Sequence, residues 1–211
     1  MNPHRRILVA ALAAAPFALA PFGALAQERP QYTELKPPQP TESGGKIEVI
    51  EFFWYGCPHC YNLEPTLEAW AKKLPADVAL RLIPAVFNER WAYDAAIFYT
   101  FDALGVLERV HRPFFDAIHR DRLRTDNPAA LSEWLGKNGI DPKKFQETFK
   151  SFGVQSKTRR ATQQTVAYKI DGTPAMAVQG RFTVSAEQGR TQQGLLQTVD
   201  YLVDLVRRNK S

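Results

Sequence analysis

IEVIEFFWYGCPHC, residues 47–60, joins a run of β-branched and aromatic residues to the only two cysteines of the chain. Residues 47–54 end in an almost continuous apolar run, which predicts a central strand buried on both faces. Cys57 and Cys60 follow at once, with two residues between them. A structural disulfide normally joins distant segments, because closing a short loop constrains the unfolded chain little. The pair is therefore predicted to cycle between dithiol and disulfide at the start of a helix.

The residues after the cysteines are predicted to form a helix and a second strand. Apolar side chains recur at helical spacing from Tyr61 to Leu74, and Pro65 is expected to kink this helix without ending it. Residues 78–84 then alternate like a strand. Strand, redox turn, helix and strand predict a right-handed β-α-β crossover. The cysteines lie at the carboxyl end of its first strand, where the sites of open α/β sheets are found.

The next stretch is helical and does not fit a β-α-β alternation. Helix-boundary signals divide it into five predicted helices, at 91–104, 107–118, 127–139, from 141–142 onward, and 154–170. We interpret residues 89–152 as an all-helical insertion between two parts of one α/β domain, residues 46–88 and 153–211. A hairpin over residues 175–178 and 181–184, with a two-residue turn, and an amphipathic helix over residues 195–206 complete that domain.

The N-terminus has the pattern of a signal peptide. Residues 4–6 are basic, residues 7–25 are apolar and uncharged, and residues 24–26 form an A-x-A cleavage signal. A membrane anchor is disfavoured, because two prolines and a glycine interrupt a stretch that is short for a span. We expect residues 1–26 to be cleaved after Ala26, by either the Sec or the twin-arginine route. An extended leader over residues 27–45 would then precede the first core strand, in an exported protein whose compartment lets disulfides persist.

The charge of the chain excludes one class of partner. The formal net charge is +5, and removing residues 1–26 takes away two arginines and no acids, which leaves +3. Nucleic-acid binding needs a clustered basic face. In residues 27–211 the only tight arginine pairs, at 159–160 and 207–208, fall in helical patterns where a solvated face is expected. We expect no nucleic-acid partner, and a monomer.

Three features together resemble the DsbA family of periplasmic thiol:disulfide oxidoreductases. They are the Glu-Phe-Phe-aromatic run leading into Cys-Pro-His-Cys, the helical insertion, and the late Gly-Thr-Pro-Ala of residues 172–175 before a hairpin. The resemblance covers nearly the whole mature chain. It implies a thioredoxin fold split by a helical domain, in a periplasmic protein that oxidises newly exported proteins and is reoxidised by a DsbB-like inner-membrane quinone reductase. The redox-active disulfide would take the place of a bound cofactor, and no metal is expected.

The chemistry of the motif points in the same direction. Cys57, at a helix N-terminus, meets backbone N–H groups and the positive end of the macrodipole, which favour its thiolate. Pro58 and His59 lie between the sulfurs and are predicted to tune their acidity, His59 by a nearby donor or positive charge. Cys60, one turn into the helix, is expected to stay protonated and to resolve mixed disulfides. A stabilised dithiol means a reactive disulfide, so both cysteines are the candidate catalytic residues.

The resemblance assigns three further site residues. Glu51 matches the buried acid that the family places beneath the disulfide as a proton relay, although an edge or surface position remains open, since an unpaired buried carboxylate is costly. Thr173 and Pro174 match the family's substrate loop, so their peptide bond is expected to be cis, with Thr173 backbone groups beside Cys57 ready to bind an extended substrate.

Other functions and plainer roles remain open. A periplasmic disulfide isomerase or reductase is the rival enzyme, and a Cys/His metal-binding or copper-chaperone protein is the rival from another class. Four further sites are expected to be structural or solvent-exposed. Glu64 is expected on a solvated helix face, His111 and His119 on the surface, and Trp91 with the Phe98-Tyr99-Phe101 cluster in the core of the insertion.

Overall fold

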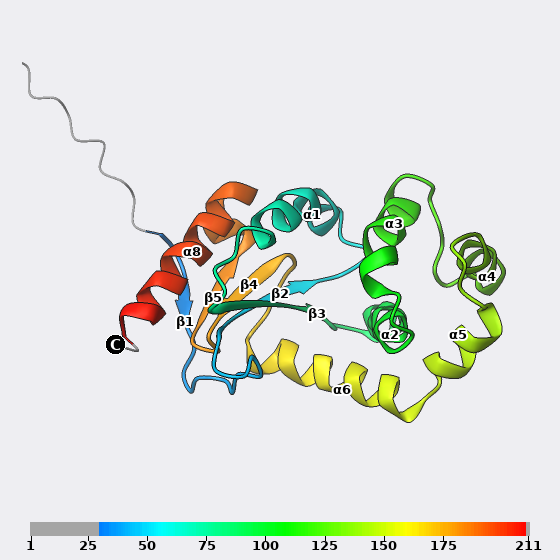
Figure 1. Cartoon of the computed structure of the whole chain (residues 1–211), viewed down its shortest axis with the longest axis horizontal. Coiled ribbons are helices and arrows are strands. Elements are labelled where there is room, and N and C mark those ends of the chain that lie inside the picture. Colours follow the sequence, from blue (N-terminus) through cyan, green and yellow to red (C-terminus); the bar gives the residue numbers. More distant parts are fainter. Residues whose placement is uncertain (1–29, 210–211) are drawn as a thin grey trace, which may run out of the picture.

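The computed structural model of the chain describes residues 30–209, so the predicted signal peptide lies outside the described residues (Figure 1). A mixed sheet of order β1-β5-β4-β2-β3 forms its centre. The strands are β1 Thr33–Glu34, β2 Ile47–Phe53, β3 Val78–Pro84, β4 Ala175–Val178 and β5 Phe182–Ser185. The helices are α1 Pro58–Ala71, α2 Glu89–Ala103, α3 Leu107–His119, α4 Pro128–Lys137, α5 Pro142–Phe149, α6 Phe152–Ala167, α7 Ala186–Gly189 and α8 Gln192–Arg208. This arrangement confirms the expected α/β fold with a helical insertion.

Strand β2 is the centre of the sheet and carries the chain to the cysteines. It pairs in parallel with β3 and antiparallel with β4, and all seven of its residues are buried. Alternate side chains of a strand point to opposite faces. Ile47 and Val49 therefore face the same way as Glu51, whereas Ile50 and Phe52 face the other way and belong to a separate apolar cluster.

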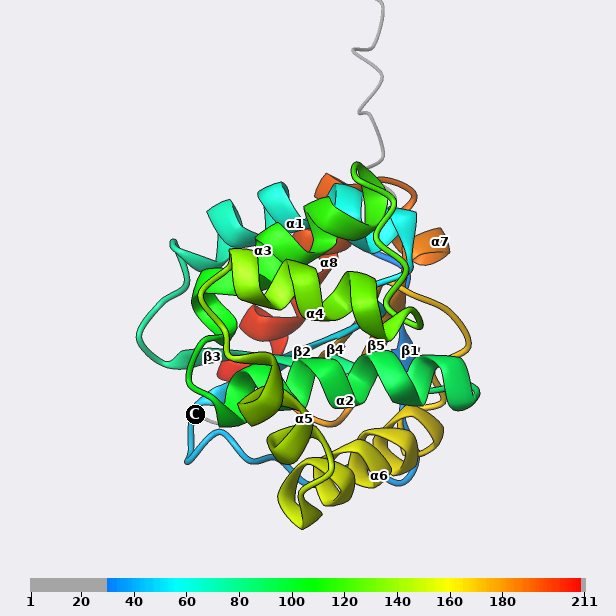
Figure 2. The same cartoon turned by 90° about the vertical axis from the view of Figure 1, so that its right-hand side faces the viewer.

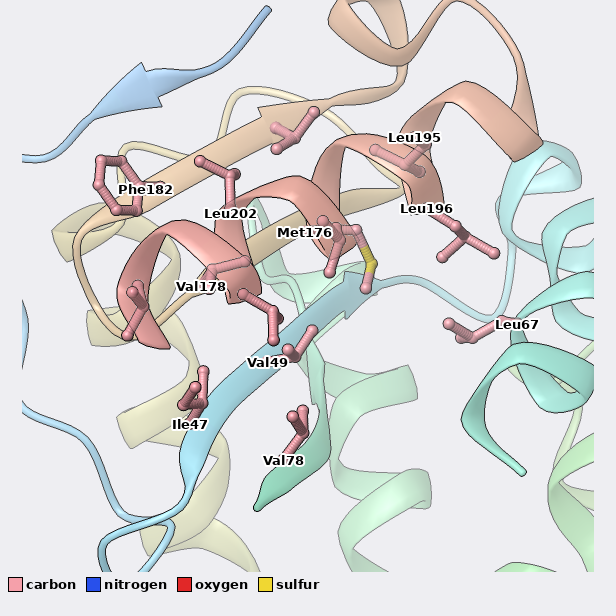
Figure 3. Packing of buried hydrophobic residues seen from close by; sticks show 14 of the residues in the cluster. Ile47, Val49, Leu67, Val78, Met176, Val178, Phe182, Leu195, Leu196 and Leu202 are labelled. Carbon is pink, nitrogen blue, oxygen red and sulfur yellow. The ribbon is translucent and has the colours of Figure 1, made fainter. Parts of the chain in front are cut away.

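Helices cover both faces of the sheet, which explains why β2 is apolar on both. In Figure 3, leucines of α8 gather with Val49 of β2 and Met176 of β4, and Leu67 of α1 belongs to the same cluster. Leu202 and Val49 in this layer are fully buried. The opposite face packs against Ala161, within α6, and Tyr168, just beyond its end. Burial of such side chains is the main favourable term in folding.

Helices α2 to α6 follow β3 without an intervening strand, as expected. Figure 2 views this end of the molecule, where α2, α3, α4 and α5 lie in front of the sheet. Four of these helices begin at a side chain that accepts a hydrogen bond from their first turn, namely Asn88, Asn127, Asp141 and Ser151. Such caps satisfy amide groups that have no partner within the helix. The core between the helices is aromatic and includes Phe101, Phe114 and Phe145.

The leader is more than a connection, because it contributes an edge strand. Thr33 and Glu34 pair antiparallel with β5. Farther along, the Gln39 amide donates to the Gly180 carbonyl at 2.8 Å. Gly180 lies in the turn between β4 and β5 with φ +62°, and a Cβ there would meet the Gln39 carbonyl oxygen at 2.0 Å. The turn holds three residues between the paired strand ends, one more than expected.

Candidate active site

The cysteines lie where β2 passes into α1. The Cys57 amide donates to the Trp54 carbonyl at 2.9 Å, closing the turn, and Pro58 occupies the first turn of α1. Proline suits this position because the amide it lacks would have no partner within the helix. Gly56 is required in the turn, since a Cβ there would overlap the Trp54 indole at 2.3 Å. The two cysteines are thiols, with Cys57 6% exposed and Cys60 fully buried.

The Cys57 sulfur is the N-cap of α1 and is surrounded by hydrogen-bonding groups. Its Sγ accepts from the Cys60 amide at 3.4 Å, and its thiol donates to the Thr173 carbonyl at 3.3 Å. The hydrogen bond from the Cys60 thiol is the largest cause that lowers the pKa of Cys57 to about 5. Burial opposes this shift, while contacts to Thr173 and the backbone of Cys60 and His59 add to it. A thiol with this pKa is mostly thiolate at neutral pH.

The second sulfur has the opposite environment. Burial is the main cause that raises the pKa of Cys60 well above its usual value, and the hydrogen bond to Cys57 and the charges of Glu51 and Cys57 raise it further. The two thiols therefore differ in acidity, although three positions separate them in one helix. One sulfur is suited to be a nucleophile or leaving group, and the other holds its proton.

A pocket of about 360 Å³ opens beside the cysteines. Its lining comes from α1, the loop before β4, and the α7–α8 corner, and consists of His59, Leu63, Pro174, Ala186, Arg190, Thr191, Gln192 and Leu195. The Thr173-Pro174 peptide bond is cis, as expected, and the Thr173 carbonyl faces Cys57. His59 is solvent-exposed, and its backbone N–H is the part of this residue that lowers the pKa of Cys57.

Glu51 lies inside the protein, which excludes the edge or surface position that remained open. It is fully buried, and neither carboxyl oxygen has a hydrogen-bond partner among the described residues. Burial is the main cause that raises its pKa well above the usual value, followed by the charges of Glu64 and Cys57. A carboxyl group in such surroundings holds its proton to a higher pH than an exposed one does.

The expectation that Glu64 lies on a solvated face is wrong. Glu64 is 7% exposed, because this side of α1 packs against α3. The surface position expected for His111 is also wrong, since this residue of α3 is 8% exposed. Its Nε2 lies 3.4 Å from Glu64 Oε1, without hydrogen-bond geometry, and its Nδ1 lies 2.8 Å from the Tyr55 hydroxyl.

His119, also expected on the surface, is partly buried and contacts the turn before the cysteines. Its Nε2 lies 2.8 Å from the Tyr55 carbonyl oxygen, and its ring stacks on Tyr61 with ring centroids 4.7 Å apart. Tyr61 in turn donates to Asp116 of α3 at 2.8 Å. The helical insertion therefore contacts the redox turn and the start of α1 through residues of α3.

The aromatic residues expected in the insertion core divide into two groups. Phe98 and Phe101 are buried there, as expected, with Tyr99 partly buried beside them. Trp91 instead stacks on Trp54 of the redox turn, with ring centroids 4.2 Å apart. Within residues 30–209 no group of three or more His, Cys, Asp or Glu side chains is arranged to hold a metal ion, and no helix is long and apolar enough to cross a membrane.

Comparison with known proteins agrees with this geometry. A family model, the DSBA-like thioredoxin domain, matches residues 90–197. The chain is 42% identical over 177 residues to the thiol:disulfide interchange protein DsbA of Azotobacter vinelandii, covering 84% of this chain and 83% of that protein. It is 43% identical over 199 residues to DsbA of Bordetella parapertussis, covering 94% of each. The chain belongs to the DsbA family.

Solved DsbA structures share the whole fold. The crystal structure of Pseudomonas aeruginosa DsbA matches with a TM-score of 0.81 and 37% identity, covering 85% of this chain and 93% of that one. The DsbA1 oxidoreductase of Neisseria meningitidis matches with a TM-score of 0.74 and 32% identity, over 87% and 95%. Like these DsbA proteins, the chain is a thiol:disulfide oxidoreductase with a thioredoxin fold.

Sequence reasoning missed part of this DsbA site. It singled out Glu51, Cys57 and Thr173, which the structure brings together, but it assigned no site role to Tyr55, Glu64 or His111. The helical pattern of the sequence did allow a buried Glu64. This residue directly follows Leu63, which belongs to the predicted apolar face, and so it lies at the border of the buried side of the helix.

Proposed function

We propose that the protein is a periplasmic dithiol oxidase, which donates its Cys57–Cys60 disulfide to newly exported proteins. The observation that carries this proposal is the position of the Cys57 sulfur at the N-terminus of α1, where it accepts from the Cys60 amide at 3.4 Å. Hydrogen bonds at this position stabilise the thiolate, and therefore the dithiol form. A disulfide whose reduced form is stabilised is readily given away.

In the proposed reaction a substrate thiolate attacks Cys57 Sγ of the disulfide. The bond between the two enzyme sulfurs breaks, Cys60 leaves with the electron pair, and a mixed disulfide joins the substrate to Cys57. A second substrate thiolate then attacks the substrate sulfur of this bond and releases Cys57 as a thiolate. The substrate gains a disulfide and loses two electrons and two protons, and the enzyme becomes a dithiol.

Glu51 is proposed to supply the proton that Cys60 needs when it leaves. The carboxyl group is buried, and its ionisation would raise the pKa of Cys60 further. Its own raised pKa keeps the proton on the carboxyl to a higher pH than usual, and burial disfavours a lasting Cys60 thiolate. During reoxidation the transfer would run backwards.

Thr173 and Pro174 are proposed to bind the substrate backbone. An extended peptide next to Cys57 could pair with the free backbone groups of Thr173, as a strand added to a sheet edge does. The pocket lined by His59, Pro174 and Leu195 would take a side chain of the same peptide. Reoxidation would require a DsbB-like inner-membrane quinone reductase.

Equilibration with glutathione buffers tests whether the protein donates disulfides to its substrates or reduces them. A pKa of about 5 lies two units below neutral pH, which corresponds to at most about 3 kcal/mol, or about 60 mV, in favour of the dithiol. We expect a disulfide that is a stronger oxidant than glutathione disulfide. A potential near that of thioredoxin would support the reductase or isomerase alternative instead. Cys60→Ser should accumulate mixed disulfides with exported proteins, whereas Cys57→Ser should form none.

A further inference from the structure

Glu64 and His111 form a buried pair to which the proposed reaction gives no role. The two residues come from α1 and α3 and are 7% and 8% exposed. Burial raises the pKa of Tyr55 well above its usual value, so its hydroxyl keeps its proton and can donate to His111 Nδ1. With Tyr55 as the donor, the imidazole proton lies on Nε2, which is 3.4 Å from Glu64 Oε1, an ion-pair distance without hydrogen-bond geometry.

The neighbouring carboxyl group, Glu51, has no basic side chain at ion-pair distance among the described residues. Glu51 is fully buried, and neither of its oxygens accepts a hydrogen bond from a described residue. The charge of Glu64 nevertheless reaches it, because Glu64 is the second cause, after burial, of the raised pKa of Glu51. When two carboxyl groups share a buried site, the one with a donor or cation ionises and the other keeps the proton.

We propose that His111 is a positioning residue that holds Glu64 as the carboxylate of this pair and thereby leaves the shared proton on Glu51, beside the cysteines. The inference deepens the proposed role of Glu51 as proton donor and rests on it. In this proposal His111, a residue of the helical insertion, determines that Glu51 carries the proton. His111 itself contacts neither sulfur. The insertion would then set the protonation state of the thioredoxin-like half of the site.

The other titratable and charged groups near this site lie on α3, α2, α1 and β2, and among them Arg112 Nη1 is buried without a hydrogen-bond partner in the described residues. On α3, Arg112 Nη2 lies 3.6 Å from Asp116 and its guanidinium lies over the Tyr61 ring, while His119 contacts the Tyr55 carbonyl. On α2, Asp94 accepts from Trp54 at 2.8 Å and from Thr125 at 2.7 Å. The remaining titratable groups near the pair are Cys57 and Cys60 at the start of α1 and Glu51 on β2.

The direct test is the titration of Glu51 in reduced protein with ¹³C-labelled glutamate carboxyls, assigned with Glu51→Gln. His111→Asn removes the basic group, so Glu64 should take up a proton and stop opposing the ionisation of Glu51. We expect the Glu51 midpoint to fall by about one pH unit, and Glu64→Gln to lower it similarly. In the double variant the effect of His111→Asn should vanish, because His111 acts through Glu64.

His119→Asn is the matched control, since this histidine lies on the same helix and contacts the same tyrosine, but through its backbone carbonyl. Its Glu51 midpoint should stay in place. A midpoint that is unchanged or raised in His111→Asn overturns the proposal, as does an effect that persists in the Glu64→Gln background. If His111→Asn does not fold, Glu64→Gln alone must still lower the midpoint.

A second readout distinguishes this inference from the oxidase function itself. Ionised Glu51 opposes the Cys57 thiolate, since each raises the energy of the other's charge. The glutathione equilibrium of His111→Asn should therefore shift toward the disulfide by about two- to tenfold at the same pH. The wild-type potential tests the oxidase proposal separately, so one can fail while the other stands.

Discussion

Cys57 owes its acidity to a small number of neighbours, and the largest contribution comes from Cys60. The donors to its sulfur lie in the first turn of α1, where a helix has free amides. The side chain of Thr173, which also lowers the pKa of Cys57, belongs to a residue 116 positions away in the sequence. The acidity therefore depends partly on local helix geometry and partly on the closing of the sheet.

The contribution of Cys60 can be isolated by changing its side chain. In Cys60→Ala the donor to the Cys57 sulfur is lost, so the thiolate midpoint should rise from about 5 by about one unit or more. Cys60→Ser keeps a hydroxyl donor in the same place and should stay closer to the wild type. Thiolate absorbance at 240 nm against pH measures both. Equal midpoints in the two variants would show that this hydrogen bond does not set the acidity.

His59 is predicted to tune the same thiolate, and the structure suggests how. Its ring is exposed, whereas its backbone N–H contributes to the lowered pKa of Cys57. His59→Pro removes that N–H, so the thiolate midpoint should rise more than in His59→Ala, which keeps it. Redox potentials of the two variants should follow the same order. If Ala has the full effect, the tuning belongs to the imidazole.

At the scale of elements, strands β2 and β3 and the leader are tied together by one ionic cluster. Glu48 of β2 is fully buried, and its Oε2 accepts from Arg81 of β3 at 2.9 Å and from the Glu42 amide at 2.8 Å. Arg81 also reaches the Glu42 carboxylate at 3.2 Å. A buried carboxylate tolerates its position only while such partners remain.

Arg81→Leu should therefore destabilise the fold more than the lost surface charge suggests. The variant leaves Glu48 buried without its cation, and we expect a loss of about 2 kcal/mol in the free energy of unfolding, since Arg81 is itself partly exposed. Arg81→Lys keeps the charge and should lose less. Urea denaturation of oxidised protein measures both. A wild-type midpoint for Arg81→Leu would show that the cluster contributes nothing.

At the scale of the whole molecule, the thiolate links redox state to stability. A group whose folded-state pKa is depressed stabilises the fold fully above its unfolded pKa, and this contribution is lost as pH falls through the folded pKa. For Cys57, with a folded pKa of about 5, the contribution at pH 7 is about 2 kcal/mol after allowance for solvent screening. The disulfide form has no such charge.

We therefore predict that the reduced protein is the more stable form at pH 7, opposite to a protein with a structural disulfide. The difference should shrink as the pH falls from 7 to below about 5, where the Cys57 thiolate is protonated. Denaturant midpoints of the two forms across this range provide the measurement. An oxidised form that is more stable at pH 7 contradicts the prediction.

The fold followed from signals that are local in the sequence. Period-two and period-3.6 patterns depend on neighbouring residues, as do caps such as Asn127-Pro128 and Asp141-Pro142. The predicted β3 therefore matches residue for residue, and the five helices predicted between β3 and β4 appear in order. The redox motif was equally local. A short edge strand such as β1 carries no such signal, because two residues show no period.

The sequence by itself thus determined the order of the elements, the fold class and the two sulfurs, because each depends on residues close together in the chain. Only the tertiary structure decided that Glu64 and His111 are buried against one another. A helical pattern shows which side of α1 is apolar, but not which polar residue at its border will be covered by α3. That depends on how two distant helices pack, and packing also decides which of the two buried carboxyl groups lies at ion-pair distance from a histidine.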